Sequence, residues 1–151
     1  MKRIILIIAI ILVSTAASIV FPNLMKAMNR SRQARAMADI RAIATAWEAR
    51  AAEKKSYSVG VEQHISAADL EAALAPTYIK HMPHVDGWGT PYQFVASDFD
   101  DAGRAQSYGI RSLGSDGRPD RARVPKGATI SFADDVIYSN GAFTQFPEGA
   151  G

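Results

Sequence analysis

Residues 4–22 read IILIIAIILVSTAASIVFP, an uncharged and mostly apolar stretch that follows Lys2 and Arg3. A helix of about 20 apolar residues is long enough to cross a bilayer. The basic pair before it predicts a cytoplasmic N-terminus with the rest of the chain outside, because positive charge favours the cytoplasmic side. Two other interpretations stay open: a secretory signal whose cleavage region is STAAS (residues 14–18), or a plain membrane anchor for an unrelated domain.

Helix-forming sequence continues directly past Pro22. From Asn23 to Lys55 there is no Gly or Pro, and apolar residues recur at helical spacing. They form one stripe: Leu24, Met28, Ala36, Ile40, Ile43 and Trp47. Proline inside a helix kinks it. We therefore expect one helix of about 55 residues, roughly 80 Å long and kinked at Pro22.

The two parts of this helix need different surroundings. Residues 1–22 are apolar all round and can be covered by lipid or by the same segment of neighbouring copies. Residues 23–56 are apolar on one face, which we expect to pack on residues 57–151, a head of 95 residues that is marginal alone. A helix of this kind indicates a subunit that is stored in a membrane and assembled into a filament.

Residues 57–151 predict an α+β head. A short helix is expected in residues 66–79, capped by Ser66 with Asp69 and ended by Pro76. Strands are expected at YQFVAS (92–97) and QSYGIRSL (106–113), followed by a hairpin around Asn140-Gly141. The expected fold is a long N-terminal helix packed on a small antiparallel sheet of three or four strands.

Charge and composition exclude several classes of protein. Residues 1–56 carry ten Lys or Arg and three Asp or Glu, whereas residues 57–151 carry seven and twelve. Because the basic part begins with a hydrophobic span, membrane proximity or subunit pairing is expected, and nucleic-acid binding is not. The chain has no cysteine, hence no disulfide and no thiolate site. It also lacks a nucleophile elbow and phosphate-binding glycine loops, so no enzyme activity is expected.

Three stretches in order resemble the major pseudopilins of type II secretion and, more broadly, type IV pilins. They are ILIIAIILVSTAASIVFPNLMKAMNRSRQARAMADIRAIATAWEA (5–49), DGWGTPYQF (86–94) and YGIRSLGSDGRPD (108–120). The tail VIYSNGAFTQFPEG (136–149) resembles those of pseudopilin-like proteins. A surface pilin is the rival within the class, but its usual cysteine-closed loop cannot form here. A membrane-anchored or secreted binding module is the alternative outside the class.

The resemblance implies a structural subunit of a helical homo-oligomeric filament. It would lie in membrane lipid before assembly, as a single-pass protein of the bacterial inner membrane with its head in the periplasm. An inner-membrane assembly platform and minor pseudopilins would be its partners, and the filament would be periplasmic or extracellular. A separate cytoplasmic ATPase would supply the energy.

The first positions depart from the family's pattern. With Met1 at the first mature position, Pro22 falls on the family's kink proline. The family has Phe first and Glu fifth, after a Gly that the prepilin peptidase recognises, whereas Met1 and Ile5 stand here. Either the leader lies outside this sequence, or the subunit is not processed in the usual way. Ile5 cannot neutralise a neighbour's N-terminal amine, as the family's Glu is thought to do.

The resemblance also implies a calcium site. Its ligands would be the carbonyl of Leu113, the carboxylate of Asp116 and a second Asp after the loop, for which Asp134 and Asp135 are the candidates. Calcium takes six to eight oxygen ligands. The alternative is a loop in which basic residues neutralise the acids; it carries Arg118, Arg121, Arg123 and Lys126.

Two other acidic or histidine groups are weaker metal candidates. Asp98, Asp100 and Asp101 begin like an EF-hand loop, but Gly109 stands where the bidentate Glu is required, so a turn is expected. His81 and His84 have a spacing that zinc sites use, but they lack further ligands.

Overall fold

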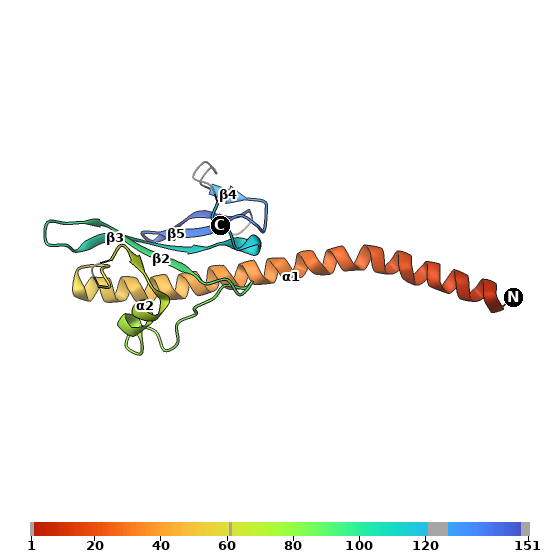
Figure 1. The fold of residues 1–151 in the computed structure, drawn as a ribbon, viewed down its shortest axis with the longest axis horizontal. Helices are drawn as coiled ribbons and strands as arrows, with labels where there is room; N and C mark the ends of the chain where they lie inside the picture. The colour runs from red at the N-terminus through yellow and green to blue at the C-terminus, as the bar shows by residue number, and fades with distance from the viewer. Residues whose placement is uncertain (1, 61, 121–126, 149–151) are drawn as a thin grey trace.

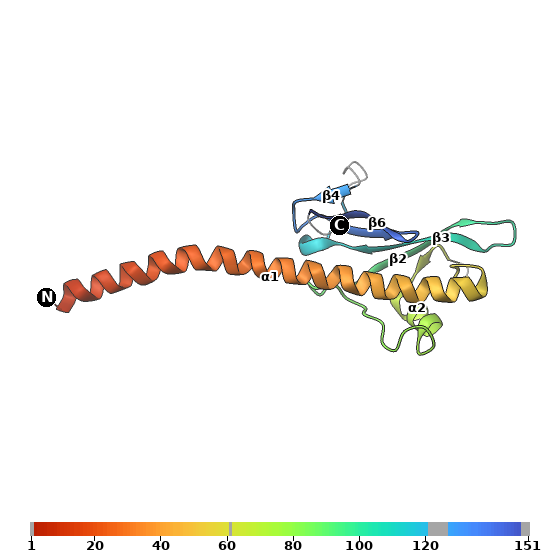
Figure 2. The ribbon, with the colours of Figure 1, turned by 180° about the vertical axis from the view of Figure 1, so that it is seen from behind.

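The structure is a computed structural model that describes the backbone of residues 2–60, 62–120 and 127–148, and the side chains of these ranges from residue 21 onward. One long helix, α1 (Lys2–Lys54), carries the head near its C-terminal end and extends far beyond it at the other (Figures 1 and 2). The head holds helix α2 (Ala67–Leu74) and a 3₁₀ turn (Gly114–Asp116). Its strands are β1 (His64–Ile65), β2 (Gln93–Phe99), β3 (Ala105–Ser112), β4 (Gly127–Thr129), β5 (Val136–Ser139) and β6 (Ala142–Pro147).

The single long helix is confirmed. Pro22 lies inside α1, which is uninterrupted and bends gently along its N-terminal half (Figure 1). Proline removes one backbone hydrogen bond, and a long helix absorbs this loss by bending. Where side chains are described, no helix is both long and apolar enough to cross a membrane. The side chains of residues 1–20, which make up most of the predicted span and include Ile5, lie outside that part of the chain.

The apolar stripe of α1 packs on the head only from its second half onward. Ala36, Ile40, Ile43 and Trp47 are buried, as predicted. The prediction is wrong for Leu24 and Met28, which are 54% and 41% exposed. Periodicity shows which residues share a helix face, but it does not show where the partner surface ends, and this head ends before Met28.

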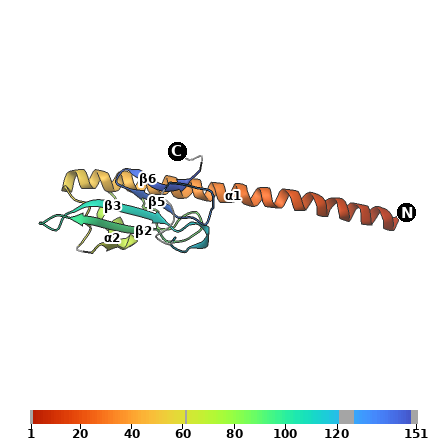
Figure 3. The same ribbon diagram turned by 90° about the horizontal axis from the view of Figure 1, so that it is seen from above.

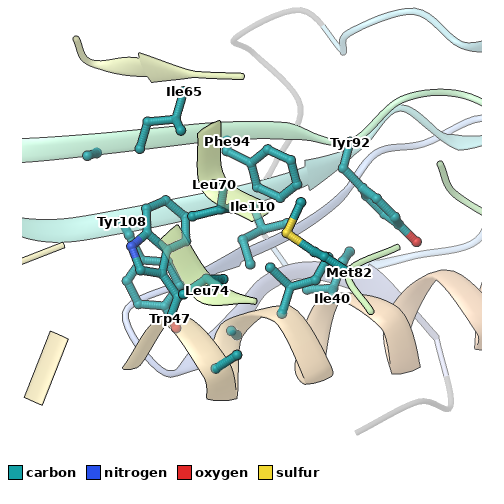
Figure 4. Packing of buried hydrophobic residues seen from close by; sticks show 14 of the residues in the cluster. Ile40, Trp47, Ile65, Leu70, Leu74, Met82, Tyr92, Phe94, Tyr108 and Ile110 are labelled. Atoms are coloured by element: carbon teal, nitrogen blue, oxygen red, sulfur yellow. The ribbon is translucent and has the colours of Figure 1, made fainter. Parts of the chain in front are cut away.

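Aromatic rings surround Trp47 at the centre of the core. The ring centroid of Trp47 lies 5.0 Å from that of Tyr108 and 6.4 Å from those of Tyr57 and Phe94. The indole Nε1 donates a hydrogen bond to the Tyr57 carbonyl at 3.0 Å, so its polar atom is satisfied. Leu74 of α2 lies beside Trp47 (Figure 4), which confirms that the short helix packs into the same core.

The sheet runs in the order β1-β2-β3-β5-β6-β4, and its long strands β2 and β3 lie along the C-terminal half of α1 (Figure 3). Neighbouring strands are antiparallel except β4, which pairs parallel with β6. The predicted hairpin joins β5 and β6 through Asn140 and Gly141, both at positive φ (49° and 89°). The fold class is confirmed, but six strands form where three or four were expected. β1 and β4 are two and three residues long, too short to show an alternating pattern.

Candidate functional site

The DGWGT turn (86–90) fastens the head to α1. Asp86 is buried, and its Oδ1 accepts hydrogen bonds from the backbone N–H groups of Trp88 and Thr90, each at 2.9 Å. Its Oδ2 accepts one from the Ser112 hydroxyl at 2.7 Å. Because Ser112 is the last residue of β3, one carboxylate joins the turn to the end of the central strand.

Gly87 brings this turn against the backbone of α1. A Cβ atom at this position would clash with the backbone of Arg32, so only glycine fits without movement. The indole Nε1 of Trp88 donates a hydrogen bond to Asn29 Oδ1 at 3.4 Å. Asn29 lies on α1 four residues after Met25, which is exposed. The turn therefore contacts α1 at the place where the helix leaves the head.

The connection from β3 to β5 leaves and returns on neighbouring strands, since Ser112 pairs with Val136. Its two ends are joined directly. The backbone N–H of Ser115 donates to the Phe132 carbonyl at 2.8 Å. Gly114 has φ +64°, and a Cβ there would lie 2.5 Å from the Ala133 carbonyl oxygen. Glycine is thus needed at this position for both its conformation and its lack of a side chain.

A buried ion pair lies beside this connection. Asp135 is fully buried, and its Oδ2 accepts hydrogen bonds from the Arg111 guanidinium through Nε and Nη2. The Asp120 N–H donates to the same oxygen at 3.0 Å, and the Asp135 N–H donates to Asp120 Oδ2 at 2.8 Å. Burial raises the pKa of the Asp135 carboxyl, while the hydrogen bond from Asp120 and the charge of Arg111 oppose that rise.

The predicted calcium ligands lie at the two ends of the β3–β5 connection. Each of the three acids accepts hydrogen bonds from a different donor. Asp116 Oδ1 accepts from the Arg118 N–H at 3.0 Å, Asp134 Oδ2 from the Ser131 N–H at 3.3 Å, and Asp135 from Arg111. Within the described ranges, no three His, Cys, Asp or Glu side chains are grouped so that they could hold a metal ion. As arranged, the acids do not fit a cage of calcium ligands. Calcium binding by Leu113, Asp116, Asp134 and Asp135 stays a prediction.

Arg111 is a partner of Asp135 that was not expected from the sequence. The acids of the loop were matched with the loop's own cations, but Arg111 precedes the loop, on β3. Of those cations, Arg121, Arg123 and Lys126 lie outside the described residues. No local pattern in the sequence indicates this pair, because Arg111 comes near Asp135 only when β3 pairs with β5 and Arg111 lies opposite Ile137.

The other acidic cluster is a turn, as predicted. Asp100 Oδ1 accepts hydrogen bonds from the N–H groups of Ala102 and Arg104, at 3.0 and 2.8 Å, and the Arg104 side chain pairs with its other oxygen. These bonds close the β2–β3 hairpin. His84 Nε2 lies 2.7 Å from Glu71 Oε2, and His81 is exposed. Zinc binding by the two histidines is not expected.

An apolar surface lies on α1 just outside the head. It consists of Phe21, Leu24, Met25 and Met28, all exposed, and is followed by Arg30. Pro22 is exposed on the same segment. Soluble monomers rarely expose neighbouring large apolar side chains on successive helical turns, so this surface indicates a partner.

A long helix with only its C-terminal half packed on an antiparallel head defines a pilin-like subunit. Residues 23–128 match the family model described as type II secretion system (T2SS), protein G. A curated relative, the type II secretion system core protein G of Aeromonas hydrophila, is 30% identical over 118 residues, covering 73% of this chain and 78% of the relative. No solved structure gives a significant match.

The chain belongs to the type II secretion system protein G family, the major pseudopilins. The resemblance drawn from the three sequence stretches is thereby confirmed. The family is structural, and its members assemble into a filament with other secretion components.

Proposed function

We propose that this chain is the structural subunit of a type II secretion pseudopilus, stored in the bacterial inner membrane and assembled through the N-terminal part of α1. One observation carries the proposal: α1 continues far past the head (Figure 1), and every residue from Phe21 to Met28 is exposed. The same segment exposes four large apolar side chains. Burying them against lipid or neighbouring helices removes apolar area from water, at about 25 cal/mol per Å².

The head and the helix then have separate tasks. The apolar part of α1 is satisfied by lipid before assembly and by copies of itself afterwards. The DGWGT turn and the sheet hold the helix at a fixed direction, which sets how heads are arranged around the filament. An inner-membrane assembly platform and minor pseudopilins are the partners we propose, because the family match points to assembly with other secretion components. A separate ATPase would supply the energy, since the sequence shows no phosphate-binding loop.

Removing residues 1–22 is expected to separate folding from assembly. The head core starts beyond this segment, so the truncated chain should unfold at nearly the same temperature as the full chain. It should be monomeric by size-exclusion chromatography with light scattering, whereas the full chain assembles. Leu24, Met25 and Met28 remain in the truncated chain, so the comparison isolates the first segment. Equal polymerisation of the two chains would mean that residues 1–22 are not the assembly element.

A further inference from the structure

Two contacts hold the ends of the β3–β5 connection together. The connection runs from Leu113 to Asp135, and the strands on either side of it are hydrogen-bonded neighbours. Bringing the two ends of a long connection together costs chain entropy, and contacts near those ends help to offset this cost. The backbone bond between Ser115 and Phe132 is one such link. The second link is the ion pair between Arg111 and Asp135.

The ion pair between Arg111 and Asp135 lies where it can join the two ends of the connection. Arg111 lies on β3 just before the connection begins, and Asp135 is the last residue before β5. The guanidinium therefore bridges the strand that leaves and the segment that returns. Arg111 Nη2 also donates to the Asp120 carbonyl at 3.3 Å, and Gln145 of β6 donates to Asp120 Oδ2 at 2.7 Å. These side chains thus tie the connection to β3 and β6.

A positive charge is required at this point. A buried carboxylate without a partner is costly, and Asp135 has no exposed surface. Its Oδ2 receives all the hydrogen bonds, whereas the buried Oδ1 has no partner among the described residues. Among the described residues, the Arg111 guanidinium reaches this carboxylate only through Oδ2. Arginine suits this because it stays charged at every relevant pH and donates two hydrogen bonds in a fixed plane.

We propose that the Arg111 guanidinium is a built-in counter-ion that closes the β3–β5 connection, at the place where the family resemblance implies a calcium ion. The head then folds fully without a divalent cation, and its stability does not follow the calcium concentration around it. This property concerns the head alone and does not depend on whether the chain forms a filament.

Thermal unfolding of the full chain in detergent micelles, with excess EDTA or excess calcium chloride, tests the proposal. The wild-type melting temperature is expected to be the same in both. Arg111→Gln should lower the melting temperature by roughly 10 °C in both, because one partner of a buried pair is removed. Arg118→Gln, an exposed arginine in the same connection, is the matched control and should change it little.

A double-mutant cycle measures whether Arg111 stabilises the head through Asp135. Asp135→Asn removes the buried charge, so Arg111→Gln should lower the melting temperature much less in that background than in the wild type. An equal loss in both backgrounds would show that Arg111 does not act through Asp135 and would overturn the proposal. A wild-type melting temperature that falls in EDTA and recovers with calcium would also overturn it, and this measurement needs no variant to fold.

Discussion

Ile40→Asp is expected to lower the free energy of unfolding by about 4 kcal/mol or more. Ile40 is fully buried between α1 and the sheet, in the cluster that also holds Trp47 and Leu74. A carboxylate at that point has no cation to pair with in the cluster, so it must be buried charged or take up a proton. Circular dichroism should show a melting temperature lower by roughly 10 °C or more.

Ala42→Asp is the matched control for this substitution. Ala42 is exposed, lies two residues away on the same helix, and acquires the same side chain. Its melting temperature should stay within a few degrees of the wild type. Arg41 is a poorer control, because its guanidinium lies 5.0 Å from the ring centroid of Phe143 and contributes to packing. Equal melting temperatures for Ile40→Asp and Ala42→Asp would contradict the assigned buried face of α1.

Asp86→Ala is expected to be almost as damaging, at about 3–4 kcal/mol. The substitution leaves three buried or half-buried donors without their acceptor: the N–H groups of Trp88 and Thr90 and the hydroxyl of Ser112. The contact between the DGWGT turn and α1 should then weaken. Amide hydrogen exchange in the variant should be faster than in the wild type within the turn and at the end of β3. Exchange in the distant β2–β3 hairpin should change less.

Asp116→Ala provides the comparison for Asp86→Ala. Asp116 is also an acid in a turn near the end of β3, but it is exposed and accepts one backbone hydrogen bond, from Arg118. A loss of less than about 1 kcal/mol is expected, because water replaces the lost acceptor. If the two alanine variants unfold at the same temperature, the Asp86 carboxylate does not organise the turn.

The long helix and its buried face could be predicted because both depend on local pattern. An uninterrupted run without glycine from Asn23 to Lys55 favours one helix, and apolar spacing identifies Ile40 and Trp47 as core residues. The hairpin at Asn140-Gly141 is equally local, since both residues adopt the positive φ that the turn requires.

The features that sequence analysis missed depend on contacts between distant segments. Strand β4 is recognisable only because it pairs with β6, and the exposure of Leu24 follows from where the head ends. The pairing of Arg111 with Asp135 requires β3 to lie beside β5. The role of Gly87 likewise becomes clear only when the turn is placed against Arg32 of α1.

Cryo-electron microscopy of filaments formed by the full chain with its assembly platform would show whether α1 is the assembly element. We expect a helical filament in which the N-terminal halves of α1 pack side by side along the axis, with the β-sheets outside and the DGWGT turns facing the helices. A filament whose axis is formed by the heads, with the free part of α1 pointing outward, would contradict it.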